Sequence, residues 1–236
     1  MKKIMVMSAL VLAATSAIAD DKIEKPEKVA VALTQAYIPG GFDSNDRAEM
    51  VIEGYFPNTC YRVGPIEKRV NNATKEVTVS QIAYKYKGTC LMMIVPFTQT
   101  VQLGILRADT YNVKDAANNK TVGKLPVSET KSSNPDDFVY AHVTDAYMDA
   151  ESEKNELVVY GSVPGSCWKV KDIRAFQDGK NVIAVLPILE KTEVKNCDEM
   201  VVPFVSRVTL PEVESGRYLI HVRSQNGVAV NKLADL

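Results

Sequence analysis

Short apolar runs alternate with turn residues along this chain, in a pattern typical of β-strands. In the C-terminal half the runs recur at regular intervals, separated by tight-turn sequences such as QDGK and SQNG. They predict strands near 138–147, 156–163, 167–176, 180–189, 200–210, 217–224 and 227–232. After the first twenty residues no stretch keeps apolar residues at helical spacing, so helices should be scarce. Seven short strands in about 100 residues indicate a β-sandwich.

The whole pattern occurs twice. A shift of 107 positions aligns residues 51–113 with 158–220 without a gap and gives 14 identical pairs over 63 positions. The phrase GYFPNTCYRV is answered by GSVPGSCWKV, and MIVPF by MVVPF. Each copy is far longer than a solenoid unit, so each should own a hydrophobic core. The sequence therefore predicts two tandem β-sandwiches.

The repeated phrase contains a turn. Pro164 and Gly165 suit the central positions of a type II turn, because proline presets φ and glycine accepts a positive φ. The first copy has Pro57 followed by Asn58, the next best tolerated residue at that position. We expect this turn to join two antiparallel strands in each copy.

After the turn, alternate side chains should face the same way. Tyr61 and Val63 in the first copy, and Trp168 and Val170 in the second, should point into the sandwich, with the cysteine beside each aromatic facing away. Burying such an aromatic contributes on the order of 2 to 3 kcal/mol. The alternative is an exposed ring that stacks on a sugar or peptide, which the alternation does not favour.

The segment LPEVESGRYLIHV resembles the tyrosine corner of fibronectin type III and immunoglobulin-like sandwiches, with Leu210, Gly216 and Tyr218 at the matching positions. The first copy keeps Tyr111 but has Asp109 in place of the glycine. The resemblance implies two immunoglobulin-like sandwiches of about seven strands each. The cysteines depart from the antibody pattern, since they fall at the start of the third strand and before the fifth, so no antibody function is implied.

Four cysteines allow three pairings. Each copy contains two cysteines 30 residues apart, so Cys60 with Cys90 and Cys167 with Cys197 is the simplest scheme. Each bridge should stabilise its module by roughly 3 to 4 kcal/mol. The alternative, a metal or redox site, lacks a CxxC motif and repeated histidine partners.

The first residues have the form of a signal peptide. Lys2 and Lys3 precede an apolar run and a small-x-small cleavage site that ends at Ala19. We therefore expect residues 1–19 to be removed and the chain to be periplasmic or secreted. A buried helix or a membrane anchor is the alternative, but the run is too short to span a bilayer, and no later stretch is longer.

The remaining chain divides by composition. We expect a disordered lead-in at 20–28, the first sandwich at 29–125, a linker at 126–136 and the second sandwich at 137–236. The linker is rich in Pro, Ser and charged residues, so the modules should move relative to each other. Without residues 1–19 the chain has 26 basic and 29 acidic residues, and nucleic acid binding is not expected.

The sequence contains no GxSxG, HExxH or phosphate-binding glycine loop, so no catalytic residue, cofactor or metal is expected. His142 and His221 are isolated, which favours structural roles over catalysis. The acidic DSND at 43–46 could hold Ca²⁺, although acidic turns usually face water. YKYK at 84–87 could contact a ligand or be an edge strand guarded by lysines. In the second copy, the acidic loop at 190–199 stands at the position that corresponds to YKYK.

These observations favour an exported, non-catalytic binding or structural protein of the bacterial envelope. Its partner would be a protein or glycan, contacted by loops at the sandwich ends or by the groove between the modules. A periplasmic inhibitor or chaperone-like accessory that pairs a strand edge with its partner is the alternative. A hydrolase would need a pocket with a perturbed acid or base.

Overall fold

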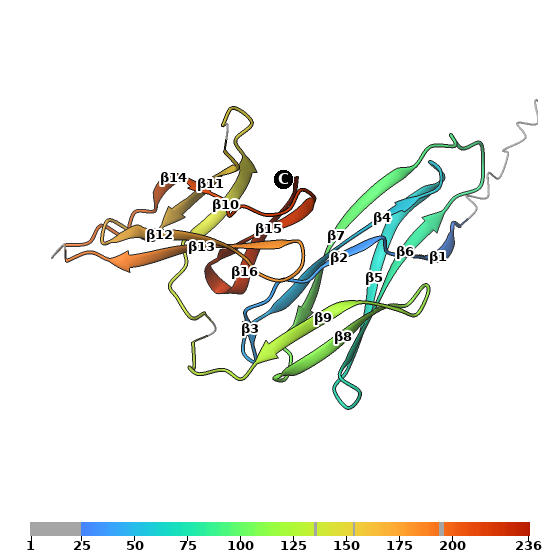
Figure 1. The fold of residues 1–236 in the computed structure, drawn as a ribbon, viewed down its shortest axis with the longest axis horizontal. Helices are drawn as coiled ribbons and strands as arrows, with labels where there is room; N and C mark the ends of the chain where they lie inside the picture. Colours follow the sequence, from blue (N-terminus) through green and yellow to red (C-terminus); the bar gives the residue numbers. More distant parts are fainter. Residues whose placement is uncertain (1–24, 135, 153, 194–195) are drawn as a thin grey trace, which may run out of the picture.

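The structure, a computed structural model, describes residues 25–134, 136–152, 154–193 and 196–236. Strands form two modules that lie side by side along the long axis of the molecule (Figure 1). Within the described residues the one helical element is the 3-10 turn η1 (Gln225–Gly227), and no helix is long and apolar enough to cross a membrane. The predicted all-β fold with two sandwiches is confirmed. The predicted signal peptide lies outside the described residues.

The first module is built from two sheets. One contains β1 (Glu27–Val31), β3 (Phe42–Asp43), β5 (Tyr61–Asn71), β6 (Glu76–Lys85), β8 (Asp109–Asp115) and β9 (Lys120–Ser128). The other contains β2 (Gln35–Tyr37), β4 (Ala48–Phe56) and β7 (Val95–Gly104). Their inner faces meet in one core, to which β4 contributes Ile52, β6 contributes Val79 and β8 contributes Val113.

The second module repeats this plan. One sheet has the order β12 (Trp168–Gln177), β13 (Val182–Lys191), β15 (Arg217–Ser224), β16 (Val228–Asp235). The other has the order β10 (His142–Met148), β11 (Glu156–Val163), β14 (Val202–Thr209). Leu157, Ile183 and Ile220 lie in a core separate from that of the first module. Each copy therefore owns a core, as the repeat predicts.

The strand order departs from that of immunoglobulin domains, in which the third strand belongs to the same antiparallel sheet as the sixth and seventh. In each copy here, the strand that corresponds to the fourth immunoglobulin strand lies beside the one that corresponds to the sixth, and the two are parallel. These pairs are β6 with β8 in the first module and β13 with β15 in the second. The third strands, β5 and β12, each pair with one neighbour among the described residues and so lie at a sheet edge.

Because β6 lies between β5 and β8, and β13 between β12 and β15, each third strand is one strand farther from the middle of its sheet than in an immunoglobulin domain. The aromatic after each turn is therefore not the central anchor that the alternation predicts. Trp168 is only partly buried, against a small cluster that includes Leu189 at one end of the second sandwich. Tyr61 is also partly buried, and its ring centroid lies 5.8 Å from that of Phe56 at the margin of the first core. Val63 is 41% exposed, which contradicts its expected inward position. An edge strand leaves part of its inner face open to water.

The tyrosine corner is present in the first copy. The hydroxyl of the buried Tyr111 lies 3.1 Å from the carbonyl oxygen of Arg107, four residues upstream, and 2.8 Å from Oδ1 of Asn72, so both acceptors share its one proton. Asp109, which replaces the glycine of the motif, forms an ion pair with Lys75 at 2.7 Å. In the second copy, where the sequence predicts the corner, Tyr218 is buried in the core, but within the described residues its hydroxyl makes no hydrogen bond to upstream backbone, so the expected corner is not formed there.

The two turns of the repeated phrase are stabilised differently. Gly165, after Pro164, has φ +134°, and a Cβ there would lie 2.4 Å from the carbonyl oxygen of Asp198. Asn58, after Pro57, does not have a positive φ. Its Oδ1 instead accepts a hydrogen bond from the Cys60 amide at 3.0 Å, which makes an Asx turn. The expected positive φ at Asn58 is therefore wrong.

Two predicted boundaries shift. Glu27 and Lys28, assigned to the disordered lead-in, belong to β1, which pairs with β6. Residues 126–128, assigned to the linker, belong to β9. The connection after β9 is held to the first module by the Asn45 amide, whose Nδ2 donates to the carbonyls of Ser132 and Asn134 at 3.1 and 3.0 Å.

Candidate functional site

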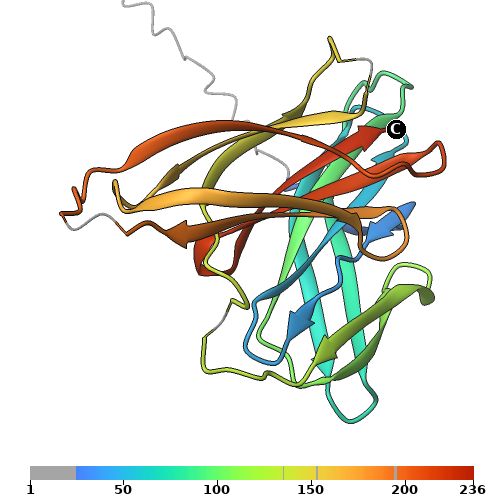
Figure 2. The same ribbon diagram turned by 60° about the vertical axis from the view of Figure 1, so that its left-hand side comes forward.

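The two modules are packed against each other. The outer face of the β2-β4-β7 sheet meets the outer face of β13, β15 and β16, with the strands of the two modules crossing (Figure 2). Tyr37 and Val51 of the first module cluster there with Val182, Leu219 and Leu233 of the second. The sequence predicted freely moving modules, whereas the structure joins them through this junction.

A buried ion pair lies at the edge of the junction. Nη2 of Arg223 on β15 is 3.1 Å from Oδ2 of Asp46, and both side chains are buried. The guanidinium also lies over the Phe42 ring, 5.1 Å from its centroid. Asp46 is the last residue of the DSND turn, and Asp43 in that turn accepts a hydrogen bond from the Asn45 amide. The Asp43 carboxylate therefore stabilises the turn, and the Asp46 carboxylate stabilises the junction.

His221 lies in the same junction and is 2% exposed. Its Nδ1 lies 2.8 Å from Oδ1 of Asn231, whose Nδ2 donates to Glu49 Oε1 at 2.6 Å. Burial lowers the pKa of His221 to about 4, because the apolar surroundings disfavour the charged imidazolium. The neutral, enclosed imidazole holds the Asn231 side chain, which in turn makes the hydrogen bond to Glu49 of the first module. His142 lies on β10 and is exposed.

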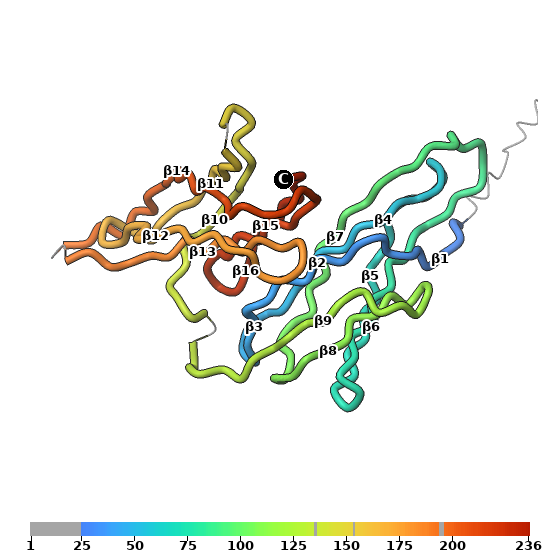
Figure 3. Tube along the Cα trace, viewed as in Figure 1, coloured from blue at the N-terminus to red at the C-terminus, as the bar shows by residue number. Residues whose placement is uncertain are grey.

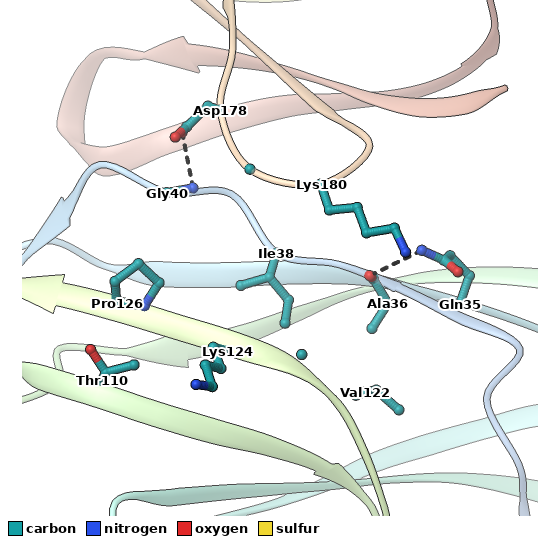
Figure 4. A pocket seen from close by; sticks show the side chains of 12 residues that line it. Gln35, Ala36, Ile38, Gly40, Thr110, Val122, Lys124, Pro126, Asp178 and Lys180 are labelled. Carbon is teal, nitrogen blue, oxygen red and sulfur yellow. Dashed lines mark hydrogen bonds between the residues drawn. The ribbon is translucent and has the colours of Figure 1, made fainter. Parts of the chain in front are cut away.

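A groove of about 590 Å³ opens beside the junction (Figure 4). Ala36, Ile38 and Val122 give it an apolar lining, and Lys124 and Lys180 add charge. At one end Asp178, in the turn between β12 and β13, accepts a hydrogen bond from the Gly40 amide at 2.9 Å. Burial raises the pKa of Asp178. The groove has the size of a small-molecule site.

Exposed apolar side chains gather at both ends of the molecule. We call residues 86–94, between β6 and β7, the first tip, and residues 196–201, before β14, the second tip; the two lie at opposite ends of the trace (Figure 3). In the first tip Met92 is 84% exposed and Leu91 68%, and in the second Met200 is 70% exposed. Soluble domains rarely expose such clusters unless they bind something.

Disulfide bonds anchor both tips. Cys60 is bonded to Cys90, and Cys167 to Cys197, which confirms the predicted pairing. Beside the first bond, the amide of Thr59 donates to the carbonyl of Leu91 at 3.2 Å, and the Leu91 amide donates back to Thr59 Oγ1 at 3.0 Å.

The second tip repeats this exchange. The Ser166 amide donates to the Asp198 carbonyl at 2.9 Å, and the Asp198 amide to Ser166 Oγ at 2.8 Å. The repeated phrase therefore builds the same rigid base under each loop.

The YKYK segment belongs to the first tip and to the strand that leads into it. Tyr84 and Lys85 end β6, which pairs with β1 on one side and β5 on the other. The edge-strand interpretation is therefore wrong. Tyr86 is 46% exposed at the start of the tip. Sequence reasoning identified this segment as a candidate contact but did not connect it with the exposed apolar residues after Cys90.

The junction was also missed, although the sequence carried a signal for it. Alternation should leave one face of a sandwich strand polar and exposed, yet in β4 and β15 that face also carries an apolar residue, Val51 or Leu219, among its charged ones, and residues on both faces are buried. Such strands are buried on both sides. Within the described residues no group of three or more His, Cys, Asp or Glu side chains could hold a metal ion.

The comparison with known families agrees with this architecture. No curated protein and no solved structure matches the chain. The family model of the ORF11 beta-sandwich domain matches residues 50–125 and again residues 157–233. The starts of the two matches are 107 residues apart, the offset of the internal repeat. The chain therefore belongs to the ORF11 beta-sandwich domain family and carries its domain twice.

Proposed function

We propose that this chain is an exported, non-catalytic binding protein of the bacterial envelope, which contacts its partner through the loops at the ends of its sandwiches. The observation that carries the proposal is the first tip, where consecutive apolar side chains from Leu91 to Ile94 are each more than half exposed on a base fixed by a disulfide bond. A rigid loop loses little conformational entropy on binding, so its apolar contacts convert efficiently into affinity.

Export is supported by the leader-like residues 1–19 and by the two disulfide bonds, which persist in oxidising compartments. N-terminal sequencing of the protein recovered from periplasm and medium tests this part. We expect a mature chain that starts at Asp20. A protein that retains residues 1–19 in the cytoplasm would contradict export.

Binding through the first tip is tested by capture from native envelope fractions, with the mature chain as bait. The variant Leu91→Asp/Met92→Glu should retain less than a tenth of the captured material. Ile105→Asp is the matched control, because Ile105 is 65% exposed in the same module but follows the other end of β7. Equal capture by all three proteins would rule out the first tip as the binding surface.

Strand-edge pairing is the second candidate, favoured by β14. This strand pairs only with β11, so its other edge is open within the described residues. Val202 and Val205 on it are 41% and 57% exposed. An extended partner segment could add to such an edge through main-chain hydrogen bonds. Val205→Pro would remove one amide donor from β14 and should abolish this mode while leaving first-tip binding unchanged.

A further inference from the structure

The two tips share a backbone but differ in chemistry. Leu91 and Met92 in the first tip correspond, at the repeat offset of 107, to Asp198 and Glu199 in the second. The amide and carbonyl of Leu91 and of Asp198 make the same pair of hydrogen bonds to the preceding turn. The local fold therefore accepts either apolar or acidic side chains here, and the apolar pair of the first tip is not required for folding.

The charge around the tips differs as well. Segments 54–63 and 84–95, which form the first tip and the strand ends beneath it, contain three basic residues and no acidic residue. The corresponding segments 161–170 and 191–202 contain three basic and three acidic residues. The first tip is therefore apolar at its end and basic around its base.

The basic side chains are placed where they can reach a surface that the tip touches. Nη1 of Arg62 donates to the carbonyls of Thr59 and Tyr61 at 2.8 and 2.9 Å, which holds its charge beside the disulfide turn. Lys85 is exposed and forms a long, exposed ion pair with Glu27, at 3.7 Å from its Nζ, which water and salt screen.

Two tyrosines flank the apolar end. Tyr55, near the end of β4, is 51% exposed, and Tyr86 is 46% exposed. Exposed apolar side chains, flanking tyrosines and a basic base are the combination by which peripheral proteins engage the interface of an anionic bilayer. The apolar side chains enter the acyl boundary, tyrosines lie at headgroup depth, and cations attract the anionic headgroups.

A lipid surface also fits the shape of the tip. The loop projects from one end of the elongated molecule (Figure 3), and a narrow projection buries little area against another convex protein, whereas stable protein interfaces bury at least about 1,200 Å² in total. A fluid bilayer closes around a projection. We therefore infer that the first tip is a docking site for anionic phospholipid headgroups and the acyl boundary beneath them, with the disulfide keeping it preformed. This inference rests on the proposed binding function and names its partner class.

The test is sedimentation of the mature chain with vesicles of phosphatidylcholine alone and with 30% phosphatidylglycerol. We expect binding to the anionic vesicles, at least tenfold weaker for Leu91→Asp/Met92→Glu and unchanged for Ile105→Asp. Lys85→Gln and Lys87→Gln should each weaken it by about fivefold, and 0.5 M salt should weaken it further. The second tip shows that the acidic pair suits this backbone, and non-reducing peptide mapping would verify the Cys60–Cys90 bond in the variant.

The outcomes separate the two proposals. Failure to bind anionic vesicles, with envelope capture still dependent on the first tip, overturns the lipid inference and leaves a protein or glycan partner. Equal capture by wild type and tip variant overturns the binding proposal itself. Concentration-dependent self-association without vesicles, lost in the tip variant, would instead identify a second copy of the chain as the partner and overturn the lipid inference.

Discussion

The guanidinium of Arg223 lies 3.1 Å from the carboxylate of Asp46, although the two residues are 177 positions apart. The pair joins β15 of the second module to the 43–46 turn of the first, so it reports on whether the modules stay docked. Because both side chains are buried, neither charge can be satisfied by water when the other is removed.

Asp46→Asn should therefore destabilise the protein strongly. It removes the one carboxylate that lies within ion-pair distance of the buried Arg223 guanidinium among the described residues, leaving only the more distant charges of Asp136 and Asp178, and we expect the free energy of unfolding to fall by about 3 kcal/mol. Urea denaturation measures this. Asp172→Asn is the control, because it breaks an exposed ion pair with Arg174 and should cost less than about 1 kcal/mol. Similar losses for the two variants would show that the junction pair is not stabilising.

His221 should make stability depend on pH. Its pKa is about 4 in the folded protein, against an ordinary value of 6.5, so the unfolded chain binds a proton there between these values and the folded chain does not. Stability therefore rises with pH across this window, and the loss between pH 6.5 and 4 is roughly 3 kcal/mol from this group.

The measurement is urea denaturation at several pH values between 4 and 7, for wild type and His221→Gln. Glu49 and Arg223, the charged groups that face the imidazole, are present in both proteins, so the difference between the two pH profiles reports on His221. The variant should show a smaller loss at low pH. Parallel profiles would mean that the pKa of His221 is the same in the folded and the unfolded protein.

The repeated glycine of the phrase GxxP should be required for packing. A Cβ on Gly161 would lie 2.3 Å from the carbonyl oxygen of His142 and 2.7 Å from the Phe204 ring, so backbone must shift to admit it. We expect Gly161→Ala to lower the midpoint of thermal unfolding and to cost about 1 to 3 kcal/mol. Gly216→Ala is the control, since its Cβ would meet Tyr218 at an ordinary 3.6 Å. A neutral Gly161→Ala would contradict the close packing.

Removing one disulfide should weaken one module. Cys60→Ala/Cys90→Ala frees a 30-residue loop in the unfolded chain, and we expect the loss of roughly 3 to 4 kcal/mol from the first module. Two-step unfolding by calorimetry would reveal which module has lost stability. The variant should also lose the fixed base of the first tip and bind its partner more weakly. Unchanged stability on reduction would mean that the bridge adds no constraint.

Much of the fold follows from local and repeated features of the sequence. The seven strands expected in the second module lie within a few residues of β10 to β16, because period-2 alternation and turn residues act over short distances. The cysteine pairing followed from duplication, since one bridge per copy needs no knowledge of the strand order.

Features that depend on contacts between distant segments were not predictable in this way. The pattern of apolar and polar residues in β13 fits an antiparallel neighbour as well as a parallel one. The parallel pairing of β13 with β15 could therefore not be predicted from that pattern. The burial of Trp168 depended on that choice, because the strand order places β12 at an edge. The cluster of exposed side chains after Cys90 needed coordinates, since an apolar run looks the same in a core strand and on a loop.

The sequence by itself determined the number of modules, their strands and their disulfide bonds, since each is encoded by neighbouring residues or by the repeat. The tertiary structure decided the strand order, the junction formed by Val51, Leu219 and the Asp46–Arg223 pair, and the exposure of the two tips. These are set by which surfaces exclude water from each other across long separations in the chain, and no local pattern specifies that choice.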